Sequence, residues 1–259
     1  MATRAPRQAA LLSAFVLHRY DWSESSLILD LFTREQGRLA VAAKGAKRPY
    51  SQLRSVLLPF QRLQVSLGKA TAARSEPAAE VQTLRAAEYA GGAVMPGGAA
   101  LFSGFYLNEL LMKMLPRHDP HPALYDAYAA TLPLLGAAAD AEVQAALRAF
   151  ELTLLQATGL LPELDVVTAT QRPVAPGARY ALQPEAGIVD GVAGTAGALD
   201  GALLIGLQAA LQHGSLEALN AACRGGLSAL KRPLRAALQH HLGTTALRTR
   251  RAMLELQSL

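Results

Sequence analysis

The fold of the amino-terminal third follows from residues 11–43, LLSAFVLHRYDWSESSLILDLFTREQGRLAVAA. Three short apolar runs, rich in β-branched and aromatic residues, are separated by polar turn residues, which is typical of strands. We expect strands over Leu11–Arg19, Ser25–Thr33 and Arg38–Ala43. Gly37 suits the second turn, because glycine tolerates the positive φ that a tight turn requires.

Two further strands are expected, at Leu57–Leu67 and Ala79–Glu88. Pro59 and Pro77 lie near or just before the starts of these runs, positions that strand edges and bulges tolerate. Five strands within about 80 residues indicate a small barrel, and the oligonucleotide-binding (OB) fold is a common type of five-stranded barrel.

The rest of the chain is rich in alanine and leucine, which favours helices. The glycine-rich segment 91–98 marks a boundary, and the apolar spacing from Phe102 to Met114 then predicts a helix. Start and stop residues predict further helices over Pro122 to about Leu135, Ala141–Thr158 with Asp140 as N-cap, Asp200 to about Gln212, Leu216–Cys223 after the cap Ser215, Leu227–Leu242 and Ala246 to about Leu256.

We therefore predict an α+β protein. An OB-type five-stranded β-barrel over residues 1–90 is followed by a mostly α-helical domain over residues 91–162 and 199–259. Residues 163–198 lack periodicity and hold many proline and glycine residues, so they predict a small irregular insertion with a hairpin near Tyr180 and Ile188.

Charge is sorted by position along the chain. Residues 1–90 carry a net +6, residues 91–210 a net −6 and residues 211–259 a net +5. Two basic blocks favour a polyanionic partner over a small neutral substrate. A phosphate backbone is the usual polyanion, because each cation that contacts it releases condensed counterions.

The strongest local signal is the segment 44–49, which places Lys44, Lys47 and Arg48 directly after a predicted strand. Gly45 allows the backbone to approach a partner closely. On a barrel this loop would direct cations toward a phosphate backbone, together with Arg19, Arg38 and Arg54 of the same block. The alternative is a solvated loop whose charge only keeps the protein soluble.

Aromatic side chains in predicted loops add stacking platforms for bases. Tyr20, Trp22 and Tyr50 are the candidates, whereas Phe15, Phe32 and Phe60 are expected in the core.

The second basic cluster lies on the last two predicted helices. Its members are expected to contact DNA, the alternative being a solvated helix face: Lys231, Arg232, Arg235, Arg248, Arg250 and Arg251. Arg232 and Arg235 are three residues apart and are expected to share a side of their helix.

Catalytic and metal sites find little support. Cys223 is the only cysteine, which excludes a cysteine-based zinc site and favours a reducing, cytoplasmic setting; we expect its side chain to be a small buried hydrophobe. No nucleophile elbow, phosphate-binding loop or dinucleotide loop is present, so no cofactor and no enzyme activity are expected. Asp21, Glu24, Asp30 and Glu35 leave a metal-dependent nuclease as one alternative.

Several segments, in this order along the chain, resemble the bacterial RecO recombination mediators: Ala14–Arg19, Glu24–Thr33, Gly37–Leu39, Lys44–Pro49, Tyr106–Leu111, Leu147–Leu152, Thr158–Pro162 and Leu242–Arg251. The resemblance implies an OB domain, a helical domain and a zinc-finger-like insertion. It also implies binding of single- and double-stranded DNA and annealing of complementary strands, together with RecR and single-stranded-DNA-binding protein (SSB), to help RecA load. The chain departs from the pattern of many members because residues 163–198 contain no cysteine.

An SSB tail is acidic with an apolar end, so it needs an apolar groove rimmed by cations. The stripe from Phe102 to Met114, with Lys113 and Arg117, is our candidate. A further alternative is a protein-only adaptor whose acidic middle binds partners while the basic blocks are merely solvated.

Overall fold

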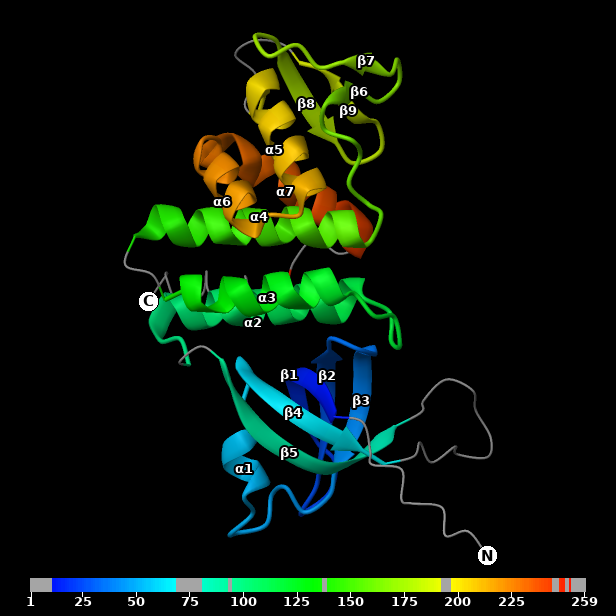
Figure 1. Ribbon diagram of the computed structural model, residues 1–259, viewed down its shortest axis with the longest axis vertical. Helices are drawn as coiled ribbons and strands as arrows, with labels where there is room; N and C mark the ends of the chain where they lie inside the picture. The colour runs from blue at the N-terminus through cyan, green and yellow to red at the C-terminus, as the bar shows by residue number, and fades with distance from the viewer. Residues whose placement is uncertain are drawn as a thin grey trace, which may run out of the picture. The chain divides into compact units, whose positions relative to one another are not determined.

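The computed structural model describes residues 11–68, 81–92, 95–136, 139–191, 197–243, 247–249 and 252, and its elements are labelled in Figure 1. Five strands form a closed barrel in the order β1-β2-β3-β5-β4. They are β1 (Leu11–Asp21), β2 (Leu27–Thr33), β3 (Gly37–Ala43), β4 (Gln61–Leu67) and β5 (Gln82–Gly92). All neighbours pair antiparallel except β3 and β5, which pair in parallel. The predicted fold class, an OB-type barrel followed by helices, is confirmed.

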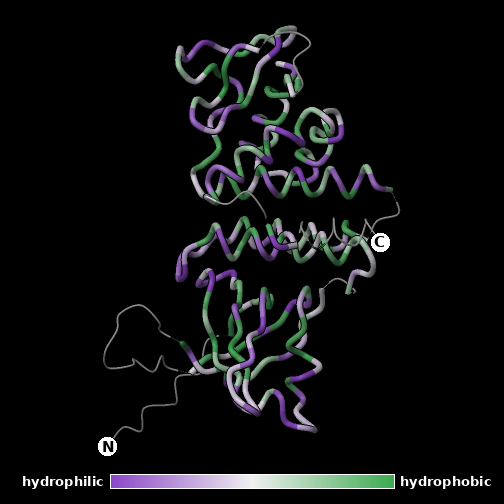
Figure 2. Tube along the Cα trace, turned by 180° about the vertical axis from the view of Figure 1, so that it is seen from behind, coloured by the Kyte–Doolittle hydropathy of each residue, from purple (hydrophilic) through white to green (hydrophobic). Residues whose placement is uncertain are grey.

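The barrel closes because alternate residues of its strands are apolar, as the changing hydropathy along the strands in Figure 2 indicates. Ala14 and Val16 of β1, Leu29 and Leu31 of β2, and Leu39 of β3 are buried in one cluster. The rings of Phe15 and Phe32 alternate with that cluster and pack on Tyr125 instead, with ring centroids 5.2 and 5.5 Å away. Both rings are buried, as expected.

The strand predicted from Leu57 is wrong in its first four residues. A short helix, α1 (Leu53–Val56), precedes this point, and the amide of Leu57 donates to the Leu53 carbonyl. Phe60 has a left-handed backbone with φ of 68°, which turns the chain before β4 begins at Gln61. Its ring is fully buried, as predicted. Burial of the ring therefore stabilises a left-handed backbone that a phenylalanine rarely adopts.

Helices make up most of the remaining described chain: α2 (Gly98–Met114), α3 (Pro122–Leu134), α4 (Asp140–Ala157), α5 (Gly201–His213), α6 (Leu216–Arg224) and α7 (Leu227–Leu242). The predicted caps Asp200 and Ser215 accept hydrogen bonds from the amides of Ala202 and Ala218. Asp140, by contrast, is the first helical residue rather than the cap of α4, since Ala139 holds the cap position. The helix expected over 246–256 lies mostly outside the described residues.

Residues 163–198 are more regular than expected. They contain β6 (Val166–Val167), β7 (Arg172–Pro173), β8 (Arg179–Gln183) and β9 (Gly187–Asp190), and the predicted hairpin is the β8–β9 pair. β8 also pairs with β10 (Leu199–Asp200). The Tyr180 hydroxyl accepts from the amide of Ala175, and the Thr168 hydroxyl accepts from the amide of Ile188. Hydrogen bonds and packing therefore hold this region without cysteine.

The chain divides into two compact units, Met1–Met95 with Leu115–Asp126, and Pro96–Met114 with Ala127–Leu259. We call them the barrel unit and the helical unit. That the domains of this protein meet near residues 91–98 remains a prediction.

Candidate nucleic-acid interface and a cation-rimmed groove

The loop 44–50 connects the end of β3 to the residues before α1. Gly45 has φ of 72° and lets the chain reverse, so that the amide of Arg48 donates to the Gly45 carbonyl over 3.1 Å. The amide of Lys47 donates to the Ser25 carbonyl over 3.0 Å, which joins the loop to the turn between β1 and β2. Two segments some twenty residues apart in sequence therefore form one end of the barrel.

The cations of this loop have different surroundings. Lys44 and Arg48 are exposed, and among the described residues neither has a carboxylate within ion-pair distance. Together with Gly45, Pro49, Tyr50 and Ser51 they line a shallow hollow of about 560 Å³. The Lys47 ammonium lies 3.0 Å from an Asp21 carboxylate oxygen and donates to the Ser23 carbonyl. Because Asp21 is largely exposed, this ion pair is weak and can give way to a phosphate.

Exposed aromatic rings accompany these cations. Tyr50 is fully exposed, and Trp22 is 57% exposed on the turn that Lys47 contacts. Tyr20 is half exposed and packs edge-on against His18, with ring centroids 4.4 Å apart. Tyr89 of β5 is 59% exposed as well, which strand periodicity did not predict, but its ring does not line the hollow of the loop.

Arg19 and Arg54 are exposed on the same unit. A guanidinium nitrogen of Arg19 donates to the Leu57 carbonyl over 3.3 Å, which fastens the segment after α1 to β1. Arg54 lies in the last turn of α1.

Arg38 is bound internally, contrary to the expectation that it flanks the loop as a DNA contact. Its Nε lies 3.1 Å from a carboxylate oxygen of Asp30, and its Nη1 donates to the Leu115 carbonyl over 2.8 Å. Burial raises the pKa of Asp30, while the charges of Arg38 and Arg117 oppose the rise. Since the Arg38 side chain is only 14% exposed, its charge serves Asp30 rather than a ligand.

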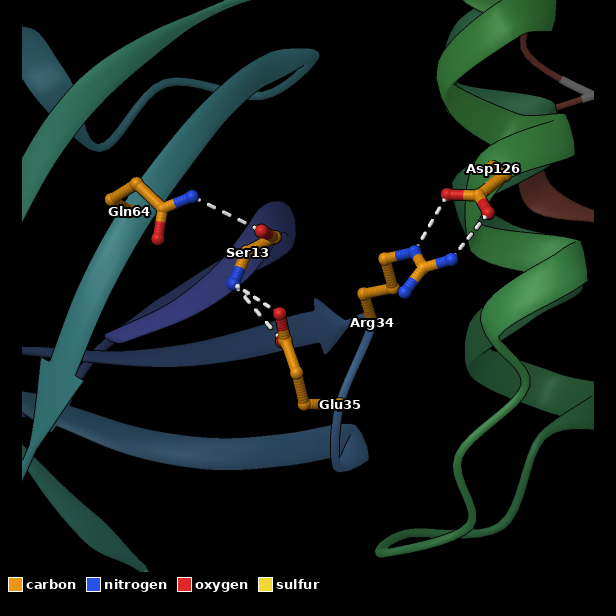
Figure 3. Close-up of polar contacts among 5 residues, drawn as sticks. All are labelled: Ser13, Arg34, Glu35, Gln64 and Asp126. Carbon is orange, nitrogen blue, oxygen red and sulfur yellow. Dashed lines mark hydrogen bonds and ion pairs between the residues drawn. The ribbon is translucent and has the colours of Figure 1, made fainter. Parts of the chain in front are cut away.

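The turn between β2 and β3 carries two charged side chains, Arg34 and Glu35, that form hydrogen bonds within the barrel unit (Figure 3). The Arg34 guanidinium donates two hydrogen bonds of 2.9 Å to the carboxylate of Asp126. Both carboxylate oxygens of Glu35 accept from the amide of Ser13, whose hydroxyl accepts from the side-chain amide of Gln64. This turn is therefore a structural joint of the barrel unit.

The four carboxylates of the nuclease alternative do not converge. Asp21 pairs with Lys47, Asp30 with Arg38, and Glu35 with the Ser13 amide. Within the described residues no group of three or more His, Cys, Asp or Glu side chains could hold a metal ion.

In the helical unit, a groove of about 360 Å³ is lined by apolar side chains of α2, α4 and α7 and by residues 247 and 249. Phe102, Tyr106, Leu147 and Leu238 contribute apolar surface, as do Leu242 and Leu247. Its cations are Arg148, Lys231 and Arg235. Lys231 and Arg235 are four residues apart on α7 and so line one side of it.

This grouping differs from the expected pair of Arg232 and Arg235. Arg232 is exposed and does not line the groove. Arg248 is exposed too, and its amide donates to a carboxylate oxygen of Glu109 over 2.9 Å. Arg250 and Arg251 lie outside the described residues.

A buried carboxylate lies beneath the groove. One oxygen of Glu151 accepts from the Tyr106 hydroxyl over 2.7 Å, and the other lies 2.6 Å from an Arg148 nitrogen. Burial raises the pKa of Glu151, and the charges of Arg148 and Arg235 oppose the rise. Burial and the neighbouring Glu151 also raise the pKa of Tyr106. The Glu151 carboxylate thus offsets much of the Arg148 charge, and Lys231 and Arg235 add two cations to the α7 side of the groove.

Lys113 and Arg117, the cations expected to rim a groove, have carboxylate partners instead. The Lys113 ammonium lies 3.1 Å from a Glu109 oxygen, and an Arg117 nitrogen lies 3.7 Å from an Asp30 oxygen. Neither lines the groove, although Phe102 and Tyr106 of the predicted stripe do.

Cys223 is buried, as expected, and burial raises the pKa of its thiol to about 12. In the part of the chain that the structure describes, no helix is long and apolar enough to cross a membrane.

Comparison with known proteins identifies relatives along nearly the whole chain. The family model described as recombination protein O N terminal matches residues 10–84, and the one described as recombination protein O C terminal matches residues 97–251. A DNA repair protein RecO from Polaromonas sp. (strain JS666) is 51% identical over 247 residues, covering 95% of this chain and 96% of the relative. Those from Polaromonas naphthalenivorans and Variovorax paradoxus are 52% and 51% identical, again over 95% of this chain and 96% of each relative. None of these descriptions names an enzyme.

Proposed function

The chain belongs to the RecO family of DNA repair proteins, and we propose that it serves repair and recombination by binding DNA at the loop 44–50 of its barrel. The observation that carries this proposal is the meeting of Lys44, Arg48 and Tyr50 around one hollow, beside the turn that holds Trp22. Cations contact the phosphates, and the aromatic rings stack on unpaired bases.

Contacts of this kind carry no sequence preference, because phosphates are identical along a strand and every base has a stacking face. The same loop therefore serves single- and double-stranded DNA, with the rings adding affinity for single strands. Annealing follows from charge: cations that screen the repulsion between two phosphate backbones allow complementary strands to approach, and base pairing then selects the partner strand. Arg19 and Arg54 extend this basic surface, and Arg232 and Arg248 supply exposed cations in the helical unit. Arg250 and Arg251 remain further candidates.

The groove of the helical unit fits the acidic, apolar-ended tail of SSB. Phe102, Leu147 and Leu238 offer apolar surface to the end of the tail, and Lys231 and Arg235 offer charge to its carboxylates. Binding there would bring this protein to SSB-coated strands, where it helps RecA to replace SSB, in concert with RecR. Association with the nucleoid follows from the proposed DNA binding.

The decisive experiment measures the affinity for an oligo(dT) strand as a function of salt. Several phosphate contacts require log K to fall steeply with log[salt]. Reversing Lys44 and Arg48 to Glu removes about two of them, which makes the slope shallower by about 1.4, at about 0.7 per contact on a single strand. The matched control reverses Arg62 and Arg85, two exposed cations on β4 and β5.

A flat salt dependence in the wild type, or equal effects of the two double reversals, overturns the proposal. Unchanged affinity after reversal at the loop would favour the protein-only adaptor, in which these cations are merely solvated.

A further inference from the structure

A second groove in the helical unit has the opposite charge character. It has a volume of about 370 Å³ and lies between α3, α4 and α6. Its apolar lining consists of Ala130, Leu134, Ala145 and Leu216. The hollow exists because alanine stands at two of these positions, where longer side chains would fill the space between the helices.

Polar residues of α4 and α6 surround this lining: Glu142, Glu217, Asn220 and Arg224. The α6 residues Glu217, Asn220 and Arg224 recur at helical spacing, while Leu219 and Cys223 are buried on another side of α6. One face of α6 therefore packs in the core, and another face lines the groove.

Three polar groups of the groove have no partner within the described part of the chain: the carboxylates of Glu142 and Glu217 and the side-chain oxygen of Asn220. Glu142 and Glu217 are exposed, and neither has a basic side chain within ion-pair distance among the described residues. The side-chain oxygen of Asn220 is buried, and no hydrogen-bond donor reaches it in the described part of the chain. The carboxylates of Glu142 and Glu217 are therefore the polar groups of the groove that we consider for ligand binding.

We propose that this groove binds a basic amphipathic segment of a protein partner. Apolar side chains of the segment occupy the surface between Ala130 and Leu216, and a lysine or arginine lies between Glu142 and Glu217. Helix-in-groove recognition of this kind uses a few anchor side chains, which suits a hollow near the small end of the range of about 300–1,000 Å³ for ligand sites.

Charge argues against DNA as the occupant. The carboxylates of Glu142 and Glu217 outnumber the single cation Arg224, so the lining has a net negative charge that repels phosphates and attracts a cationic peptide. The helical unit thus offers two apolar grooves of opposite charge, one for acidic and one for basic segments, and this inference goes beyond the DNA-binding proposal without depending on it.

The test uses the full chain and two fluorescein-labelled helical peptides of identical leucine pattern, one with lysines and one with glutamates at the polar positions. We expect the lysine peptide to bind the wild type at least about tenfold more tightly in fluorescence anisotropy, a difference of about 1.4 kcal/mol. Glu142→Lys with Glu217→Lys should reverse the preference. Glu163→Lys with Glu185→Lys, which changes two exposed acids of the same unit outside the groove, should preserve it.

Ala130→Leu provides a second readout that leaves charge unchanged. Ala130 is exposed in α3, so the substitution is tolerated by the fold while it fills the groove, and binding of the lysine peptide should be lost. Retained binding in this variant, or an unchanged preference after reversal at Glu142 and Glu217, refutes the proposal. Loss of oligo(dT) affinity in Ala130→Leu would assign the groove to DNA, and a changed sedimentation coefficient would assign it to a second copy; either result overturns the inference.

Discussion

The carboxylate of Asp30 lies 3.1 Å from Nε of Arg38 and neutralises a cation that we expected beside the loop 44–50. Asp30 is 3% exposed, and Arg117 approaches its other oxygen at 3.7 Å. Charge placement inside the barrel unit therefore decides which of its arginines remain available for ligands.

Asp30→Asn should destabilise the protein. It should not affect DNA cleavage, which only the nuclease alternative would require of Asp30. Arg38 would keep a largely buried charge without its carboxylate, which costs about 3–5 kcal/mol. Urea unfolding followed by circular dichroism measures the loss. Asp21→Asn is the control, because its exposed pair with Lys47 is worth at most about 1 kcal/mol. A Mg²⁺-dependent nuclease activity that disappears in Asp30→Asn would contradict this structural role.

Gly37→Ala should be far more damaging than Gly45→Ala. Both glycines have a positive φ, 70° and 72°, so each substitution carries a strain of about 1–3 kcal/mol. A Cβ at Gly37 would also clash with the backbone oxygen of Asp119, whereas at Gly45 the nearest atom belongs to the flexible Arg48 side chain at 3.5 Å. Thermal unfolding of both variants decides the matter, and equal shifts in Tm would show that the Asp119 contact is unimportant.

Glu109→Gln should reveal a stabilisation that depends on pH. Burial acts to raise the pKa of Glu109, but hydrogen bonds from Thr249, from the Arg248 amide and from Lys113 outweigh it and lower the pKa below 4.5. Since the folded state holds the charged form more strongly than the unfolded state, the stabilisation is present above pH 4.5 and is lost as the pH falls through the lowered pKa.

The measurement compares the free energy of unfolding of wild type and Glu109→Gln between pH 3 and 7. We expect a gap of about 1–3 kcal/mol near neutral pH that narrows in acid. A gap that is constant with pH would mean that the carboxylate charge of Glu109 contributes nothing.

Tyr50→Ala and Trp22→Ala should each weaken binding of oligo(dT) by about 1–3 kcal/mol, the usual value of one stacked base. Tyr50→Phe keeps the ring and should retain the affinity. Tyr89→Ala removes a ring outside the loop whose exposure, 59%, is close to the 57% of Trp22, and it serves as the control in fluorescence anisotropy. If Tyr89→Ala weakens binding as strongly as Tyr50→Ala, the interface extends over β5 instead of being centred on the loop.

Lys231→Glu with Arg235→Glu should abolish binding of an acidic peptide with an apolar carboxyl end. Both cations line the cation-rimmed groove, and their reversal costs more than about tenfold in Kd, or 1.4 kcal/mol. Arg232→Glu changes an exposed cation of the same helix outside the groove and should leave the affinity nearly unchanged. Equal effects of Arg232→Glu and of either groove reversal alone would indicate attraction by net charge rather than a defined site.

Local patterns were enough to predict much of the architecture. Alternating apolar residues and turn residues predicted the first three strands, and Asp200 and Ser215 correctly marked two helix starts. Such features depend on neighbours within a few residues, so they are readable in sequence. The turn at Phe60 could not be predicted in this way, because burial of the ring in the barrel overrides the tendency of phenylalanine to avoid a positive φ.

The sequence by itself determined the first three strands, most of the helices and the positively charged loop, since each depends on residues close along the chain, whereas closure of the barrel pairs β1 with β4 and β3 with β5 over longer separations. Only the tertiary structure decided which cations are engaged: Asp30 takes up Arg38 and Arg117, Glu109 takes up Lys113, and a groove forms around Lys231 and Arg235. The physical reason is that Coulomb attraction and desolvation depend on distances of a few ångströms between residues far apart in sequence, which folding alone brings together.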